Sequence, residues 1–348
     1  MKPFTALRLI LQTFMHRNSL QTSLRSKIPG ATFLVVAALS FLSLMVGKYP
    51  LTPSLLLHGN PQALRVFLTL RIPRTCMALF GGFGLGIAGY VFQTIFRNPL
   101  ASPDIIGVSS GASAGAAFGI LFLSSGAFWG GLPVTLSAFL GGLLAVMLTL
   151  ALGSLSSGKG SASIVLAGIA VHSLAQTLLM VLKLLADPEK ELASIEYWLM
   201  GSLGSISLYR LPASLIIGIC SIVGICLLHR QILLLSLEDS ESRMLGVPTG
   251  RLRLAVLFLA TLLTASVISN TGLISFVGLL APHTARLLIK KSRFPALVLS
   301  GLWGSLLLLS ADILARSVAA SELPVSIFTS LSGAPFLIYL VLKKGDNT

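Results

Sequence analysis

The sequence predicts an all-α integral membrane protein with about ten transmembrane helices. The first observation behind this prediction is composition: the 348-residue chain is 54% hydrophobic and only 10% charged, and its mean hydropathy is +0.91. Soluble domains carry about 25% charged residues, so this chain has too few charges to coat a water-exposed surface. Most of the surface must therefore face lipid, which excludes a disordered chain and disfavours a soluble enzyme.

The second observation is a series of apolar segments near the length of about 20 residues that a helix needs to cross a bilayer. They span residues 31–47, 75–96, 104–125, 130–153, 161–185, 211–229, 252–270, 273–289, 295–317 and 324–342. Pro282 and His283 interrupt the eighth segment, so we expect a broken helix or a re-entrant segment there.

The ends of the chain are polar. Residues 1–30 are predicted to form a basic cytoplasmic tail, residues 31–343 the transmembrane domain, and residues 344–348 a short cytoplasmic tail. The segment 31–47 lacks a following small-residue cleavage site, so it is interpreted as a retained first span and not as a signal peptide.

The distribution of Lys and Arg predicts the orientation. With ten spans and both termini in the cytoplasm, the inner loops hold roughly twice as many Lys and Arg as the outer loops, as the positive-inside rule requires. The net charge of +14 therefore follows mostly from topology, and no nucleic-acid partner is needed to explain it.

Small residues at a spacing of four predict close helix packing. Gly82 and Gly86 form one such pair, and Gly111, Gly115 and Gly119 form a longer series. Glycines at this spacing let helix backbones approach closely in lipid. We interpret them as packing positions in preference to substrate contacts.

The sequence gives no indication of a bound metal or cofactor. The three cysteines lie inside apolar segments and the five histidines are scattered, which is not a metal-ligand pattern. Residues 153–160 resemble a phosphate-binding P-loop, but Gly160 stands where Ser or Thr is required and an apolar segment precedes it. We therefore expect no cofactor on this chain, and any ATP hydrolysis to occur in a separate subunit.

Two polar segments flank the second apolar segment. Arg71 and Arg74 surround Pro73 before it, and either lipid headgroups or a protein partner could account for them. Residues 97–104 follow it, and Ser102, Pro103 and Asp104 in this turn suit the first positions of a helix. A well-capped inner turn explains these three residues but leaves residues 97–99 unexplained.

The loop 230–251 predicts a short amphipathic helix of about nine residues. Ser236 suits its N-cap and Gly246 its left-handed end, while Leu237, Met244 and Leu245 are apolar. A short helix with apolar side chains and an acidic rim suits a groove on a partner better than it suits a solvated linker.

Asp312 and Arg316 lie four residues apart near the end of the ninth segment, and Glu322 follows them. This spacing predicts an ion pair, so a structural role is the first interpretation of Asp312. Arg316 lies closer to the outer surface and could also serve a partner.

Taken together, the sequence motifs in these segments resemble those of the permease subunits of bacterial ABC importers for iron–siderophore, haem and vitamin B12, the FecCD-like family. The resemblance covers about residues 31–343 and includes 71–74, 92–93, 97–104, 106–112, 198–203, 245–247, 274–283, 322–324 and 333–335. It implies a vitamin B12-importer-like bundle in the bacterial inner membrane. It also implies two permease subunits, two cytoplasmic ATPases and an extracytoplasmic substrate-binding protein.

The resemblance also implies roles for individual residues. The outer arginines that would dock the binding protein are Arg71, Arg74 and Arg316. The residues that would couple to the ATPase are Glu238, Asp239, Glu241, Met244, Leu245, Gly246 and Val247. The residues that would narrow the inner end of the pathway are Asn98, Leu100 and Ser161. The fifth and tenth spans would line the pathway at the interface between permease subunits.

The resemblance favours ferric siderophore as cargo because residues 98–104 look most like the siderophore members. Haem and vitamin B12 stay open as alternatives. An ion-coupled secondary transporter is a further alternative, for which Asp312 and His172 are the available ionisable residues. An intramembrane enzyme is disfavoured because no catalytic set clusters inside the predicted spans.

Overall fold

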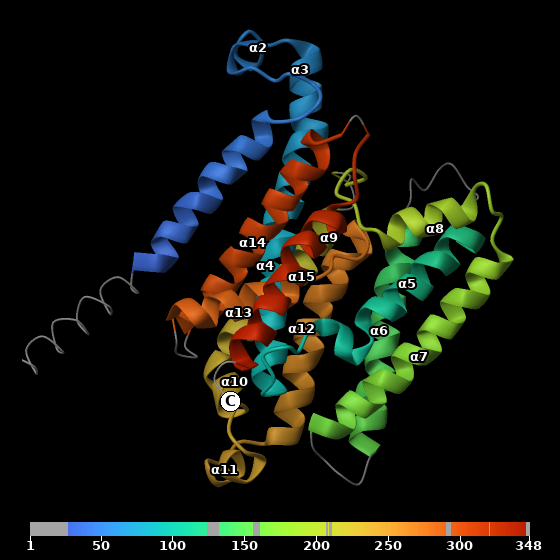
Figure 1. The fold of residues 1–348 in the computed structure, drawn as a ribbon. Helices are drawn as coiled ribbons and strands as arrows, with labels where there is room; N and C mark the ends of the chain where they lie inside the picture. Colours follow the sequence, from blue (N-terminus) through green and yellow to red (C-terminus); the bar gives the residue numbers. More distant parts are fainter. Residues whose placement is uncertain are drawn as a thin grey trace, which may run out of the picture.

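The computed structural model describes residues 27–123, 132–155, 161–206, 208, 211–289, 294–319 and 321–345. Every regular element in this part of the chain is a helix (Figure 1). The helices are a first helix Lys27–Met45, α2 Pro53–Leu57, α3 Pro61–Val66, η1 Phe67–Arg71, α4 Ile72–Ile95, η2 Pro103–Ile106, α5 Val108–Phe118, η3 Gly119–Leu123, α6 Leu132–Leu155, α7 Ser161–Leu185, α8 Glu191–Leu199, α9 Leu211–Leu227, α10 His229–Leu234, α11 Asp239–Met244, α12 Thr249–Thr271, α13 Val277–Ile289, α14 Phe294–Ser317 and α15 Val325–Gly345.

Each of the ten predicted apolar segments overlaps a helix. Six helices in the described residues are long and apolar enough to cross a membrane, and four apolar helices are shorter. The shorter four are Val108–Leu123, Leu211–Leu227, Val277–Ile289 and Val325–Tyr339. The all-helical prediction is confirmed, whereas the number of crossings and the side on which the termini lie stay predictions.

The eighth segment differs from the prediction. Pro282 lies inside α13 without breaking it, and the helix begins at Val277 instead of residue 273. Phe276, directly before it, has a left-handed backbone with φ of +66°. The chain is therefore non-helical at residues 272–276 and helical from Val277 through Pro282.

The second segment begins earlier than predicted. The chain is helical from Pro61 to Ile95, and Pro73 lies near the start of α4 within this run. A proline inside a helix removes one N–H donor and crowds the preceding turn. The π-helical turn η1 lies directly before it and gives the backbone a wider turn at this point.

Helix α4 lies at the centre of the molecule and packs against α12, α13 and α14. Its glycines permit this: a Cβ atom added at Gly82 would clash with the backbone of Gly304, and one at Gly86 with the carbonyl of Ser300. Gly111 and Gly115 of α5 meet α6 in the same way. The predicted packing role of these glycines is confirmed.

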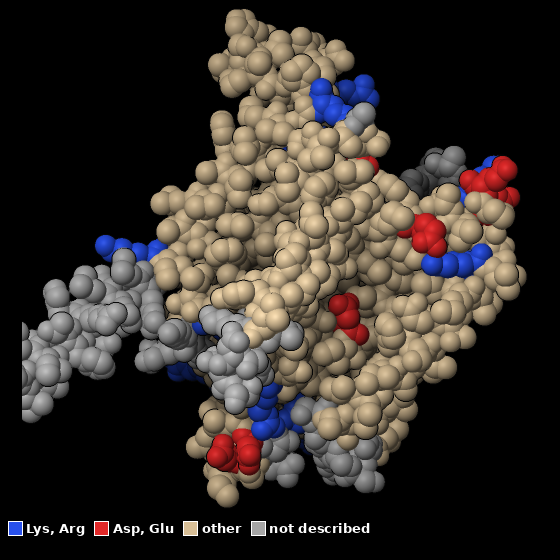
Figure 2. Space-filling model, viewed as in Figure 1, with Lys and Arg blue, Asp and Glu red and all other residues tan. Residues whose placement is uncertain are grey.

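The two ends of the bundle carry different short helices. Figure 1 shows α2 and α3 at one end and α11 at the opposite end, with α4, α12 and α14 running between them. We refer to these as the α3 end and the α11 end. Charged side chains gather mainly toward the ends, and the broad face between them is mostly uncharged (Figure 2).

Candidate functional site

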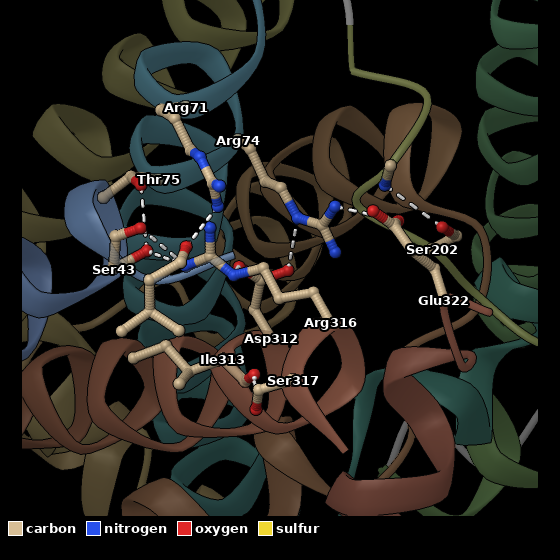
Figure 3. Close-up of polar contacts among 12 residues, drawn as sticks. Ser43, Arg71, Arg74, Thr75, Ser202, Asp312, Ile313, Arg316, Ser317 and Glu322 are labelled. Atoms are coloured by element: carbon tan, nitrogen blue, oxygen red, sulfur yellow. Dashed lines mark hydrogen bonds and ion pairs between the residues drawn. The ribbon is translucent and has the colours of Figure 1, made fainter. Parts of the chain in front are cut away.

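Two arginines at the α3 end share one buried carboxylate. Arg74 Nε lies 2.7 Å from Asp312 Oδ1, and Arg316 Nε lies 3.5 Å from Asp312 Oδ2 (Figure 3). Arg74 Nη1 also lies 2.9 Å from Glu322 Oε2. The predicted pairing of Asp312 with Arg316 is confirmed. The shorter of the two contacts with Asp312 comes from Arg74 of α4, 238 residues away in the sequence.

Other guanidinium donors join the first helix and the residues that follow it to this cluster. Arg316 Nη2 donates to the carbonyl of Ser43 over 2.8 Å and to its hydroxyl over 2.6 Å. The same hydroxyl lies 2.9 Å from the Thr75 hydroxyl. Arg71 donates to the carbonyls of Val46 and Tyr49. Elements far apart in the chain are therefore joined by one polar network, which we call the arginine cluster: Ser43, Arg71, Arg74, Asp312, Arg316 and Glu322.

The arginine cluster is mostly buried. Arg71, Arg74 and Arg316 are all buried, and Asp312 is completely inaccessible. Glu322 is the accessible carboxylate, with 36% of its side chain exposed. A cavity of about 200 Å³ lies between the loop at Lys48 and the cluster. Three cations and two carboxylates leave one formal positive charge, and Arg316 Nη1 makes no hydrogen bond in the described chain. Docking of a binding protein onto these arginines stays a prediction.

The turn 97–104 joins α4 to η2. The Leu100 amide donates to Asn98 Oδ1 over 2.9 Å, which closes a tight turn, and both side chains are exposed. Ser102 occupies the N-cap position of η2, as predicted, but its hydroxyl bonds the Asp104 carboxylate over 3.3 Å instead of a backbone amide. The gating role of Asn98 and Leu100 stays a prediction. Ser161 begins α7, and its side chain lies outside the described residues.

The predicted coupling segment forms two short helices, α10 and α11, at the α11 end. The helix α11 spans six residues, fewer than the nine predicted. Ser236 does not cap this helix, because the Ser236 hydroxyl donates to the Leu233 carbonyl over 2.6 Å. The Glu238 amide, by contrast, lies 3.4 Å from Glu241 Oε2, so the acidic side chain closes the first turn. The Ser242 hydroxyl donates to the Leu234 carbonyl over 2.7 Å and fixes α11 to α10.

The far side of α11 is left uncovered. Met244 is 86% exposed and Leu245 is also exposed, as expected for side chains that enter a partner's groove. Gly246 has φ of +78°, which confirms the left-handed residue predicted after the helix, and Val247 donates back to the Ser242 carbonyl. The side chain of Asp239 lies outside the described residues. The coupling role of this segment stays a prediction.

One helix near the α3 end was not predicted. The nine-residue α8 contains Glu196, which pairs with Lys183 of α7 over 2.8 Å, and Tyr197, whose hydroxyl donates to Ser202 over 3.1 Å. Together with the end of α12 at Asn270, it borders a cavity of about 580 Å³. A search for long apolar segments misses a helix this short and this charged.

Metal ligands do not cluster in the part of the chain that the structure describes, where no group of three or more His, Cys, Asp or Glu side chains comes together. The expectation that this chain binds no metal or cofactor of its own stays a prediction.

Comparison with known proteins places this bundle in a family. The model of the FecCD transport family matches residues 34–343. The hemin transport system permease protein HmuU of Yersinia pestis is 35% identical over 83% of this chain and 86% of its own length. The molybdate import system permease protein MolB of Haemophilus influenzae is 34% identical over 91% of this chain and 96% of its own length.

A solved structure described as an inward-facing conformation of a putative metal-chelate type ABC transporter is 33% identical, with a TM-score of 0.81. It covers 92% of this chain and 99% of its own. Because the family model spans most of the chain and several apolar helices are long enough to cross a membrane, this multi-pass inner-membrane protein belongs to the FecCD transport family of ABC transporter permeases.

Proposed function

We propose that the chain is the transmembrane permease subunit of an ATP-driven importer that takes up a ferric siderophore by alternating access. Haem and vitamin B12 are the alternative cargoes. The observation that carries this proposal is the contrast between the two ends: an uncovered acidic helix with exposed Met244 at one end, and arginines beside the accessible Glu322 at the other. An importer permease that binds ATPase subunits on one side of the membrane and a substrate-binding protein on the other needs these two surfaces.

The α11 end would receive the ATPase subunits. Exposed Met244 and Leu245 offer apolar area, and Glu238 and Glu241 offer an acidic rim, for a groove on a cytoplasmic ATPase. Closure of the two ATPases on ATP would push α10 and α11, which Ser242 holds together, and move the helices attached to them. The chain itself performs no covalent chemistry in this mechanism.

The α3 end would receive the loaded binding protein. Arginine suits this role because its planar fork can hold a carboxylate bidentately. Glu322 occupies one donor of Arg74 and is the accessible member of the cluster, so a carboxylate of the binding protein could replace it there. A second permease subunit would pack on α7 and α15, whose exposed side chains are largely apolar.

An ion-coupled transporter is the main alternative mechanism. It would need an ionisable residue that exchanges a proton or sodium ion within the bundle. Asp312 is the buried carboxylate available for this purpose, and two arginines already hold it. The pairing of Asp312 with both arginines therefore favours an ATP-driven mechanism over ion coupling.

Transport in vesicles separates the two mechanisms. The chain would be reconstituted with its ATPase, binding protein and second permease subunit, and ⁵⁵Fe-labelled chelate uptake would be followed with ATP or with a proton gradient alone. We expect uptake with ATP and none with the gradient alone. Uptake driven by the gradient without ATP would contradict the proposal and support the secondary transporter.

A further inference from the structure

A carboxylate faces a cavity between the helices of the bundle. Asp104 of η2 is exposed and lines a cavity of about 250 Å³ together with Ser102. The opposite walls come from α4, α12 and the start of α13, including Leu85, Ile268 and Phe276. Apart from Asp104 and a few hydroxyl groups, these walls are apolar or backbone.

The packing of η2 places Asp104 at the level of the middle of α4, on a face of the chain that is exposed. A Cβ atom added at Gly278 of α13 would lie 3.3 Å from Pro103 Cδ and 3.4 Å from the Leu85 carbonyl oxygen, so η2 meets α13 at the level of Leu85. Leu85 lies about ten residues before the end of α4, or roughly 15 Å at 1.5 Å per residue. The chain therefore turns back into the bundle after α4, and Asp104 lies near the middle of a spanning helix. An ionisable residue at the level of the membrane interior is costly unless it faces water or a partner, so Asp104 is a candidate functional residue.

The neighbours of η2 connect this cavity to the helices expected to line the pathway. A Cβ atom at Gly168 of α7 would clash with the Ile105 carbonyl, so η2 lies directly against α7. On the other side, the ring of Phe276 lies against Gly333 of α15. Asp104 thus borders a cavity lined by η2 and the segment around Phe276. These two elements pack in turn against α7 and α15, the fifth and tenth predicted spans.

Hydroxyl groups hold the carboxylate in place and leave its charge uncompensated. Ser109 donates to Asp104 Oδ1 and Ser102 donates to Oδ2 over 3.3 Å. A carboxylate has about four acceptor positions, so both oxygens can accept further donors. Among the described residues, no Lys or Arg forms an ion pair with Asp104.

We infer that Asp104, oriented by Ser102 and Ser109, contacts passing cargo and selects a cationic or donor-rich chelate over a free oxyanion. This inference rests on the proposed function. A negative charge in a low-dielectric passage attracts N–H, O–H and cationic groups and repels anions. The cavity is smaller than a typical pocket of 300–1,000 Å³, so it receives an edge or side arm of the cargo and not the whole molecule. The relative MolB is named as a molybdate permease, and molybdate is the kind of anion that this carboxylate disfavours.

Equilibrium dialysis of the assembled permease–ATPase complex, without binding protein, tests this selection directly. The probes are a monocationic ⁵⁵Fe trihydroxamate complex and ⁹⁹Mo-molybdate. We expect the wild-type complex to retain the cationic chelate in preference to molybdate. The Asp104→Asn change should lower the preference about tenfold, because a charge-assisted hydrogen bond is lost and the repulsion of anions disappears. Asp104→Glu should keep most of the preference, because it keeps the charge.

A second variant separates selection from a structural role. Ser109→Ala removes a hydroxyl that orients Asp104 but leaves the charge, so it should change the preference by less than Asp104→Asn. If Asp104 only caps η2, Asp104→Asn will lower thermal stability and leave the preference unchanged, which would overturn the inference. A wild-type complex without any preference for the cationic probe would overturn it too. Failure of the proposed function is separately visible as a lack of ATP-driven uptake in the vesicle assay.

Discussion

The α3 end and the α11 end of this permease hold their charged residues in opposite ways. At the α3 end, three arginines are buried and engaged by Asp312, Glu322 and backbone carbonyls of the same chain. At the α11 end, Glu241 and Met244 of a six-residue helix are exposed. The difference teaches that charged residues can be satisfied within the chain at one end of a bundle and stay exposed at the other.

The largest expected effect comes from breaking the centre of the arginine cluster. Asp312→Asn keeps the shape of the side chain but leaves Arg74 and Arg316 without their shared charge. Removing one partner of a buried ion pair costs about 3–5 kcal/mol, so we expect a comparable loss in the free energy of unfolding. Thermal unfolding of the purified protein in detergent measures this loss.

The matched control is Glu189→Gln, which removes an exposed carboxylate near α8 and should change stability by less than about 0.5 kcal/mol. An Asp312→Asn protein as stable as the wild type would show that the cluster does not hold the α3 end together.

The next effect concerns the surface at the opposite end. Replacing Met244 and Leu245 with Ser removes two exposed apolar side chains, each contributing about 1.5–3 kcal/mol when buried by a partner. We expect ATPase co-purification to fall at least about tenfold, while the unfolding temperature of the permease alone stays unchanged. Leu57→Ser in α2 alters an equally exposed side chain at the α3 end and should leave co-purification intact. Equal losses in both variants would refute a docking surface on α11.

A smaller effect should follow from freeing α11 from α10. Ser242→Ala deletes the hydroxyl that donates to the Leu234 carbonyl, a hydrogen bond worth about 1 kcal/mol. Amide hydrogen exchange in α11 should accelerate accordingly. Ser240→Ala changes an exposed serine of the same helix and provides the comparison. If both variants exchange alike, the bond to Leu234 does not position the helix.

The smallest effect is expected at the exposed edge of the arginine cluster. Glu322→Gln removes a partly exposed partner of Arg74, and ion pairs in contact with solvent contribute about 0–1 kcal/mol. Thermal unfolding should therefore shift far less than for Asp312→Asn. A loss as large as that of Asp312→Asn would mean that the two carboxylates act as one unit, and that Glu322 is not free to exchange with a partner.

The sequence was sufficient for features that depend on neighbours along the chain. The long apolar segments predicted helices, the i,i+4 spacing predicted the pair of Asp312 and Arg316, and Gly246 predicted the left-handed end of α11. Each of these features depends on hydropathy, helical periodicity or the conformational freedom of glycine, all of which act locally.

Features that depend on distant segments were not predictable in the same way. Arg74 meets Asp312 and Glu322 across 238 and 248 residues, and no local pattern indicates such a pairing. The helix α8 was missed because it is short and charged. The start of α13 was misplaced because residues 273–276 are mostly apolar yet non-helical, and hydropathy cannot distinguish a helical from a non-helical apolar stretch.

Site-specific photocrosslinking tests most directly whether the α11 end, and not the α3 end, receives a separate ATPase. A photoreactive amino acid would replace either Met244 or Leu57, which are 86% and 87% exposed at opposite ends of the same protein. In the assembled transporter we expect crosslinks to the ATPase from position 244 and none from position 57. Crosslinks to the ATPase from position 57, or from neither position, would contradict the account.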